Sequence, residues 1–282
     1  MLAHAAVAAT GPVLTPFQAF VLGAVQGLSE LLPISSSAHL YLVPTLLHWP
    51  YAGVAFDVAL HAGTLVALVG AFWKDWWNLA VDLFSFDPGK SREARQLLGM
   101  LVVATLPALM VGRVLGDLEE RLRSIPLQAS MLLVFGIVLW AADRFSKPGR
   151  DDRVPGWGPT IACGLFQCLA LVPGVSRSGI TLSAGRLTGL SRLAAARFSF
   201  MMSAPIVLAA VTYSSISKAH VLLHEMPLST LLIGVASAAV FGLFAIQFML
   251  GLLRRTGFGV FAAYRVILAL VLFIYWAGHR GA

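Results

Sequence analysis

Six long apolar runs constrain what this chain can fold into more than any other feature of its sequence. Runs of about 20 residues are long enough to cross the hydrocarbon core of a bilayer as α-helices. They cover residues 54–73, 97–115, 127–142, 193–213, 228–253 and 260–276. None keeps the strict alternation of a half-buried strand, so we expect helices and not a barrel. Only 12% of the residues are charged, which excludes an ordinary soluble domain.

The basic residues predict a membrane topology. The formal net charge is +7, and most Lys and Arg lie between the spans, where they favour the cytoplasmic side. With residues 74–96 in the cytoplasm, the cytoplasmic segments hold 12 Lys and Arg, against 4 in the outer segments 1–16, 116–126, 214–227 and 277–282. We therefore expect both termini outside the cytoplasm. This explanation of the positive charge leaves no reason to expect a nucleic-acid partner.

Two polar stretches interrupt the apolar pattern and repeat one plan. The first runs from Gln26 to His39 and the second from Gln167 to Thr181. Residues of the first recur in the second at an offset of 141, half of the 282-residue chain: Gln26 with Gln167, Ser35 with Ser176, and Ser37 with Ser178. Such self-similarity indicates an internal duplication.

Each polar stretch joins two apolar segments that are too short to span a bilayer. Short helices around a Pro/Ser loop are typical of a re-entrant hairpin, whose loop must be buried in protein or line a wet cavity. One hairpin and three spans per half give an odd number of crossings, so the second half is inverted relative to the first. We therefore expect an all-α polytopic membrane protein with one integral membrane domain over residues 1–282. Repeat one covers about 17–143, the linker about 144–159 and repeat two about 160–278, and the hairpin tips meet near mid-membrane.

Ionisable residues within the apolar segments are costly and point to a site. They are Glu30, His39, Asp57, His61, Arg113, Arg177, Arg197 and Arg265. Four arginines against two carboxylates favour an anionic ligand. Near Arg177, Gly174 and Gly179 allow close backbone approach, and Ser176, Ser178 and Thr181 add hydroxyls. A guanidinium with hydroxyls and amides suits phosphate, although a tightly packed structural loop is the alternative.

The first polar stretch adds groups suited to acid–base chemistry. Glu30 lies four residues after Gln26 and could hold a divalent cation against a polyphosphate, act as a base, or be neutralised by a buried Arg. His39 follows three serines, which permits nucleophilic or acid–base catalysis, or a structural role. Asp57 and His61 are also four apart, so they share a helix face and could line the pocket or pair with an Arg.

These residues resemble the motifs of the undecaprenyl pyrophosphate phosphatase family, also called the bacitracin resistance family. The resemblance includes Gln26 to Glu30, Pro33 to His39, and the Pro-Gly-Val-Ser-Arg-Ser-Gly-Ile-Thr segment that ends at Thr181. The span pattern agrees over nearly the whole chain. The resemblance implies hydrolysis of undecaprenyl diphosphate, a C55 isoprenyl lipid, to the monophosphate carrier of cell-wall synthesis. It also implies the bacterial cytoplasmic (inner) membrane.

Carried over by position, the resemblance implies a set of site residues. The catalytic candidates are Glu30, Ser36, His39 and Arg177; the phosphate-binding candidates are Ser35, Ser176, Arg177, Ser178 and Thr181; and Asp57, Ser37 and Gly174 are candidates for the pocket lining. A divalent cation, Mg²⁺ or Ca²⁺, is implied at Glu30, with Gln26 beside it. Gln26 stands where many members have Glu, which argues against an obligatory proton carrier at that position.

We expect Arg177 and the neighbouring hydroxyls to hold the diphosphate, Ser36 to be the nucleophile and His39 to carry the proton. Attack by water or by His39 itself stays open. The isoprenyl tail would lie between spans in membrane lipid, and the pocket would open to the outside. The competing hypothesis is a transporter or flippase for a phosphorylated isoprenoid lipid or another anion, because inverted repeats and broken helices are typical of transporters. The sequence leaves a homodimer open.

Overall fold

The computed structural model describes residues 14–115, 121–147, 149–151 and 154–279. Within these ranges the regular structure is helical, apart from an isolated bridge between Arg150 and Leu190. The helices are α1 (Pro16–Leu31), α2 (Ser36–Leu46), α3 (Gly53–Ala71), α4 (Trp73–Leu83), α5 (Pro88–Leu115), α7 (Ile125–Phe145), α8 (Trp157–Gln167), the 3₁₀ helix η1 (Cys168–Leu171), α9 (Arg177–Leu187), α10 (Arg192–Glu225), α11 (Leu228–Leu253) and α12 (Gly259–Gly278).

The six predicted spans are confirmed. Among the described residues, six helices are long and apolar enough to cross a membrane: α3, α5, α7, α10, α11 and α12. The two predicted hairpins are the pairs α1–α2 and α8–α9, the second interrupted by η1. The fold is therefore an all-α polytopic membrane protein. The inverted orientation of the halves and their boundaries remain predictions.

Two predicted connections and the first polar stretch differ from the structure. Residues 74–96 form α4 and the first turns of α5 instead of a loop. The polar residues of α4 recur at helical spacing, at Lys74, Asp75, Asn78 and Asp82, which makes an amphipathic helix that a span search overlooks. The Asp87 carboxylate caps α5 by accepting the amides of Gly89 (2.8 Å) and Lys90 (3.3 Å). The predicted connection 214–227 is helical as far as Glu225, and α1 continues to Leu31.

A capping box starts the chain's first helix. The Thr15 hydroxyl accepts the Gln18 amide (3.2 Å), and the Gln18 side chain accepts the Thr15 amide (2.9 Å), which satisfies two otherwise unpaired helix donors. Of the outer segment predicted over residues 1–16, residues 1–13 lie outside the described part of the chain. The same holds for residues 116–120 of the predicted connection 116–126.

The loops of the two hairpins repeat one backbone conformation. Ser35 has φ 77° and Ser176 has φ 73°, a region that residues other than glycine rarely enter. In each loop the hydroxyls two residues apart lie 3.3 Å from one another, Ser35 with Ser37 and Ser176 with Ser178. The duplication read from the sequence therefore has a structural counterpart at the residues of most chemical interest.

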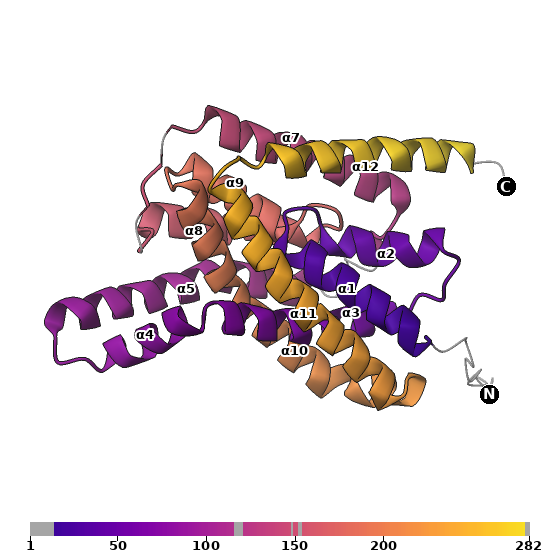
Figure 1. Cartoon of the computed structure of the whole chain (residues 1–282), viewed down its shortest axis with the longest axis horizontal. Helices are drawn as coiled ribbons and strands as arrows, with labels where there is room; N and C mark the ends of the chain where they lie inside the picture. Colours follow the sequence, from indigo (N-terminus) through magenta and orange to yellow (C-terminus); the bar gives the residue numbers. More distant parts are fainter. Residues whose placement is uncertain (1–13, 116–120, 148, 152–153, 280–282) are drawn as a thin grey trace.

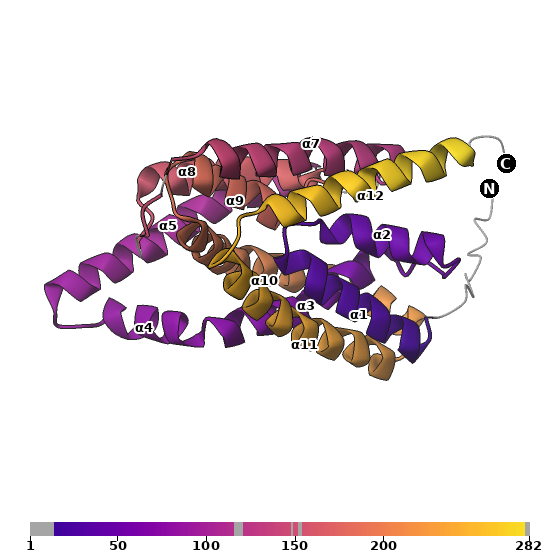
Figure 2. The ribbon, with the colours of Figure 1, turned by 45° about the horizontal axis from the view of Figure 1, so that its top comes forward.

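Helices of the two halves exchange partners. The first hairpin helix, α1, packs along α11 of the second half, and α8 packs on α5 of the first half. Corresponding spans also meet, α3 with α10 and α7 with α12, and Figures 1 and 2 both show α7 and α12 side by side. Each hairpin is thus held largely by the other half of the chain.

Small residues set the distance between α1 and α11. A Cβ at Gly23 would lie 2.1 Å from the carbonyl oxygen of Gly234, and one at Gly27 would lie 2.5 Å from that of Ala238. The spacing of four residues on both helices is the small-xxx-small pattern of close membrane helix pairs. The Ser237 hydroxyl donates to the Phe20 carbonyl at 2.8 Å. This contact fixes the position of α1, whose last turn carries Glu30.

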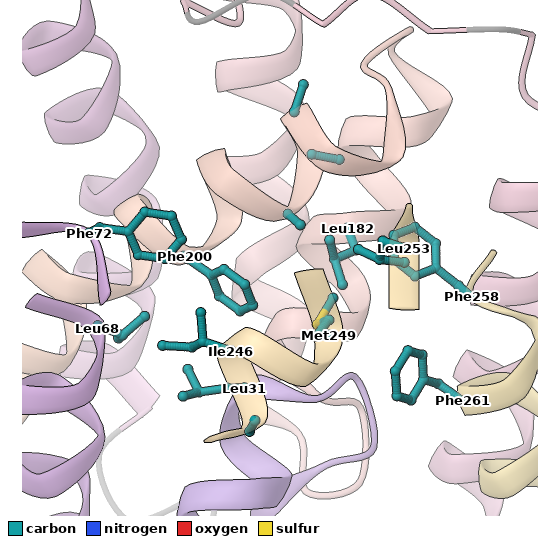
Figure 3. Close-up of a cluster of buried hydrophobic side chains, with 14 of the residues drawn as sticks. Leu31, Leu68, Phe72, Leu182, Phe200, Ile246, Met249, Leu253, Phe258 and Phe261 are labelled. Carbon is teal, nitrogen blue, oxygen red and sulfur yellow. The ribbon is translucent and has the colours of Figure 1, made fainter. Parts of the chain in front are cut away.

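The largest apolar cluster fills the centre of the molecule behind the hairpin tips. It joins side chains from α1, α3, α9, α10, α11 and α12, among them Leu31, Leu68, Leu182, Phe200, Met249 and Phe261 (Figure 3). The rings of Phe72 and Phe200 pack with centroids 5.8 Å apart. This cluster keeps the end of α1 and the body of α9 together, so the two hairpins share one rigid support.

Candidate active site

The two hairpin tips meet, as predicted from the repeat. The Ser178 hydroxyl donates to the carbonyls of Glu30 (3.2 Å) and Leu32 (3.1 Å) in the first hairpin. In the other direction, the Gly174 amide donates to the Ser37 hydroxyl at 3.4 Å. Both contacts join residues more than 130 positions apart in the chain. The polar stretches therefore form one site and not two.

Arg265 on α12 ties both tips to α7. Its fully buried guanidinium donates to carbonyl oxygens only: those of Pro33 (3.2 Å) in the first tip, Gly174 (3.0 Å) and Val175 (2.9 Å) in the second, and Met131 and Leu132 (both 3.3 Å) on α7. These partners use the donor fork of an arginine, so this cation supports the loops.

The predicted excess of buried positive charge needs correction. Arg113 is exposed, and Arg197 is exposed and pairs with Asp75 at 2.5 Å. The Arg265 guanidinium donates its hydrogen bonds to backbone carbonyl oxygens, as described above. Of the four arginines in the prediction, Arg177 alone lines the cavity described next.

A cavity of about 210 Å³ opens beside the hairpin tips. Its polar wall consists of Ser29, Glu30, Ser35, Ser36, Ser37, Asp57, His61, Arg123, Gln167, Ser176 and Arg177. Its apolar wall comes from spans and η1, with Val54 and Val58 on α3, Leu171 on η1, and Ile206 and Val207 on α10. The cavity therefore combines a cluster of charged and hydroxyl groups with a hydrocarbon-like wall.

The Glu30 carboxylate is the centre of the polar wall. The Ser36 hydroxyl donates to Oε2 at 2.5 Å, and Nη2 of Arg177 donates to Oε1 at 2.5 Å. Nε2 of His61 lies 3.4 Å from Oε2. Arg177 also donates to the Ser203 hydroxyl on α10. A hydroxyl that donates to a buried carboxylate is an activated nucleophile, because the base that can accept its proton is already in contact.

His61 is the imidazole at this carboxylate. Its Nδ1 lies 2.7 Å from the backbone oxygen of Asp57, a partner that accepts only, so Nδ1 carries a proton. Nε2 therefore faces Glu30 and the cavity. The four-residue spacing from Asp57 had indicated a shared helix face, and both side chains do line the cavity.

His39 is placed differently from the sequence expectation. Its Nδ1 contacts the Ser35 carbonyl (2.7 Å), its Nε2 contacts the Tyr264 hydroxyl (2.6 Å), and its ring stacks on that of Tyr264 at 5.7 Å. It is not among the residues that line the cavity. The structure thus places His39 behind the positive-φ loop residue Ser35, with both ring nitrogens engaged.

A second ion pair, of Arg123 and Asp57, lines the same cavity as Glu30. Nη1 of Arg123 donates to Oδ2 of Asp57 at 2.7 Å, and the Tyr51 hydroxyl donates to the same oxygen at 2.8 Å. Arg123 also donates to the Tyr51 hydroxyl. Both charged side chains are buried, at 5% and 7% exposure. The expectation that Asp57 lines the pocket or pairs with an arginine is thus met in both parts, but its partner lies in a segment that the sequence assigned to an outer connection.

The remaining predicted residues divide into two groups. Ser35, Ser37 and Ser176 lie on the cavity wall. Ser178, Thr181 and Gly174 do not: Ser178 joins the tips, Thr181 donates to the Arg177 carbonyl (2.9 Å), and Gly174, at φ 94°, offers its carbonyl to the α12 arginine. The Gly179 amide, expected to face a ligand, donates to the Ser176 hydroxyl at 3.2 Å.

Gln26 and its counterpart Gln167 behave differently. Gln26 is fully buried, and neither atom of its amide has a partner among the described residues. It lies off the cavity wall, whereas Gln167 is on the wall and donates to the Ala104 carbonyl at 3.3 Å. Gln26 therefore offers no ligand to the predicted cation on this wall.

The protein offers few donors to a divalent cation. Within the described ranges, no group of three or more His, Cys, Asp or Glu side chains is arranged to hold a metal ion. Glu30 is the carboxylate nearest to the serines and Arg177, and both of its oxygens have protein partners. Mg²⁺ is often bound through one or two carboxylates together with substrate phosphates. The residues therefore fit a cation that is held mainly by phosphate oxygens.

This geometry defines a class of protein. A guanidinium, several hydroxyls and a carboxylate-bound serine lie in a cavity that is walled by membrane spans. Such a cavity suits a phosphate group that is attached to an apolar chain, and it has the groups to cleave as well as to bind. The site thus belongs to a membrane-embedded phosphate-processing protein.

Comparison with known proteins gives the family. The family model described as bacitracin resistance protein BacA matches residues 19–271. The chain is 47% identical over 264 residues to the undecaprenyl-diphosphatase of Gemmatimonas aurantiaca, covering 92% of this chain and 97% of the relative. It is 43% identical over 265 residues to that of Moorella thermoacetica, covering 93% and 99%. The chain belongs to the bacitracin resistance protein BacA family.

Proposed function

We propose that the protein hydrolyses undecaprenyl diphosphate to undecaprenyl phosphate and inorganic phosphate, and so recycles the lipid carrier of cell-wall synthesis. The observation that carries the proposal is the contact of the Ser36 hydroxyl with Glu30, which Arg177 approaches from the other hairpin. Relatives that match nearly the whole chain carry the name undecaprenyl-diphosphatase. Nothing in the comparisons favours the transporter alternative.

The diphosphate binds where positive charge and hydroxyls converge. Arg177 and Arg123 each supply a guanidinium to the cavity wall, and each is already paired with a carboxylate. The hydroxyls of Ser35, Ser37 and Ser176 add donors between them. Donors fixed in place before the reaction stabilise the charge that spreads over the transferring phosphoryl group.

The reaction begins with attack of the Ser36 oxygen on the terminal phosphorus, while the hydroxyl proton passes to Glu30. The bond from that phosphorus to the bridging oxygen breaks, and the lipid monophosphate leaves with the electron pair. Glu30 passes this proton to the departing lipid monophosphate and is ionised again. Water then attacks the phosphorus of the phosphoserine and gives a proton to Glu30. The bond from that phosphorus to the Ser36 oxygen breaks, the Ser36 oxygen takes the proton from Glu30, and inorganic phosphate is released. His61 lies against Oε2 of Glu30 and can accept or return this proton. The alternative without a covalent intermediate is direct attack on the terminal phosphorus by a water molecule that Glu30 holds.

The isoprenyl chain fits the apolar wall of the cavity. Val58 on α3 and Ile206 on α10 line the cavity, and both helices are long and apolar enough to be membrane spans. We place the lipid tail against these spans. The tail then stays in a hydrocarbon environment while the diphosphate reaches the polar wall. The charged diphosphate is therefore not buried in lipid, which would be costly, and the isoprenyl chain is not exposed to water.

The divalent cation, Mg²⁺ or Ca²⁺, remains part of the proposal. Glu30 together with the diphosphate oxygens would hold it, and when bound it would neutralise phosphate charge. A cation bound to Glu30 would compete with Arg177 and Ser36, which already contact the two oxygens of this carboxylate. We therefore expect the cation to enter with the substrate.

Location and orientation also belong to the proposal. We place the protein in the bacterial inner membrane, with the halves inverted and the cavity open to the outer face. The distribution of Lys and Arg supports this orientation, and Arg123, which lines the cavity, comes from the connection predicted to be outside. A cysteine introduced at position 122 should react with an impermeant thiol reagent in intact cells. Labelling only after lysis would contradict the orientation.

A homodimer stays a prediction, which a measurement of the size of the protein in detergent would test.

Release of inorganic phosphate from undecaprenyl diphosphate by the purified protein in detergent tests the function. A chelator and the Glu30→Gln variant should each lower the rate, the variant by at least a thousandfold. Glu93→Gln, which removes an exposed carboxylate on α5, is the matched control and should stay within twofold. A folded protein that releases no phosphate would favour the transporter hypothesis, and an active Glu30→Gln variant would exclude the role of this carboxylate.

A further inference from the structure

A second cavity, with a volume of about 540 Å³, lies at the far end of the spans from the catalytic one. It forms where α7 and α11 end and α10 begins. Its charged wall consists of Arg144, Arg186, Arg192, Arg254, Asp143 and Asp151. Arg192 opens α10, whereas Val207 of the same helix lines the catalytic cavity. This separation is roughly 22 Å at the rise of an α-helix, so the two cavities are distinct.

The inner layer of the wall is a closed ion network. Asp143 is buried and accepts Nε of Arg192 (2.7 Å), Nε of Arg186 (3.3 Å) and the Phe258 amide (3.0 Å). Asp151 accepts the Ser191 hydroxyl at 2.9 Å. The network joins α7, α9, α10 and the start of α12. It makes a rigid floor whose carboxylate is already fully satisfied.

The outer layer carries positive charge without a counter-ion. Arg144 and Arg254 are exposed, and the side chain of neither has a hydrogen bond or an ion pair with any described residue. The Arg192 side chain is 41% exposed. The wall holds four arginines against two aspartates, which leaves two unneutralised charges. An open cavity with fixed guanidinium groups is a receptor for an anion.

Exposed aromatic residues lie next to the cavity. Trp140 and Phe145, next to Arg144 on α7, are exposed and pack edge to face with centroids 5.7 Å apart. Exposed aromatic residues at the end of a span are typical of the membrane–water interface. Leu193 and Leu253 add an apolar part to the wall. A ligand there can therefore have a charged head and hydrocarbon chains.

We propose that this cavity binds the phosphate group of an anionic membrane lipid in the leaflet opposite the catalytic opening. Guanidinium groups next to a span recognise anionic headgroups through charge and bidentate hydrogen bonds. Arg144 and Arg254 provide the donors that have no partner among the described residues, and they line the same cavity as the network around Asp143. The bound lipid bridges the ends of α7, α10 and α11, which come from different halves of the chain.

Lipid retention by the purified protein tests the site. The delipidated protein in a mild neutral detergent is titrated with phosphatidylglycerol, and bound lipid is counted by native mass spectrometry. The double variant Arg144→Gln/Arg254→Gln should weaken the first binding event about 30-fold, the factor expected from two arginines near an anionic surface. The control Arg92→Gln/Arg95→Gln removes two exposed cations of α5 and should change it less than threefold. Both double variants should keep wild-type phosphate release, because none of these residues lies at the catalytic cavity.

Two further arms distinguish the sources of phosphate. Phosphatidylcholine should bind at least tenfold more weakly than phosphatidylglycerol, and 20 mM inorganic phosphate should not displace the lipid. Binding of inorganic phosphate with equal retention of both lipids would overturn the lipid assignment. Equal loss of phosphatidylglycerol in the two double variants would overturn the site, because it would show a general surface-charge effect.

Discussion

Replacing Arg265 by lysine separates the role of its donor fork from that of its charge. The guanidinium donates to five backbone carbonyls at 2.9–3.3 Å, and lysine has three donors on one atom. At least two buried carbonyls would lose their partner, at about 1–3 kcal/mol each. The expected loss of stability is therefore about 2–6 kcal/mol. For a protein of this length, that corresponds to a melting temperature lower by roughly 5–20 °C.

The same substitution should also reduce catalysis without touching the substrate. Pro33 lies in the loop before Ser36, and Gly174 and Val175 lie in the loop before Arg177. When these carbonyls lose their donors, the two loops can move by fractions of an ångström, and misplacement on that scale is costly in catalysis. We expect kcat for phosphate release to fall at least tenfold at a temperature where the variant is folded.

Thermal unfolding in detergent and steady-state phosphate release measure the two effects. Arg113→Lys is the matched control, because Arg113 lies in a span but is exposed. It should shift the melting temperature by less than 2 °C and leave kcat unchanged. If Arg265→Lys behaves like this control in both measurements, the carbonyl network does not support the hairpin tips.

Three other substitutions test the site and the helix packing. Ser36→Ala should lower phosphate release at least a thousandfold, and a near-normal rate would exclude the covalent route. His61→Gln should lower kcat about tenfold to a hundredfold with little change in KM, because it removes the proton partner of Glu30; an unchanged pH–rate profile would contradict this role. Gly23→Ala pushes a methyl group against the backbone of α11 and should cost about 1–3 kcal/mol, measured as a lower melting temperature. Gly70→Ala, whose nearest neighbour would be 3.8 Å away, should leave that temperature unchanged.

The spans and hairpins could be predicted because their signals are local. An apolar run of bilayer length, or a short run broken by Pro and Ser, identifies its own structure wherever it lies in the chain. Helix α4 has no such signal: its charged residues interrupt the apolar ones, and in a membrane protein that composition looks like a loop. A search for long apolar runs cannot find an amphipathic helix of 11 residues.

The centre of the site could also be anticipated, since the two polar stretches contain Glu30, Ser36 and Arg177 and the family resemblance implies all three as catalytic candidates. The residues that pair with the buried charged groups of the cavity could not be predicted. Asp57 meets an arginine 66 residues away, and no local pattern specifies which cation reaches a buried carboxylate. The two histidines show the same limit. His39 and His61 both lie on short-range helical spacings from polar residues, and the rotation of each helix against its neighbours decides which ring faces Glu30.

Among the candidate site residues, those with hydroxyl side chains have the contacts that are hardest to predict from the sequence. Thr181 and Ser178 stand in the phosphate-binding motif, yet both donate to carbonyl oxygens of the protein. Short hydroxyl side chains bond the nearby backbone as readily as a ligand. Their place in the motif is therefore consistent with holding the loop in shape, and composition cannot distinguish that role from direct contact with phosphate.

The matched hairpin loops have a consequence for symmetry. At the offset of 141 that relates the halves, Ser36 corresponds to Arg177 and Glu30 corresponds to Leu171. Two identical copies facing each other would bring like charges together, either two carboxylates or two guanidiniums, and the attraction between the tips would become repulsion. A site of this kind needs unequal halves. Joining them in one chain allows each half to specialise, one as the source of nucleophile and base, the other as the clamp for the phosphate.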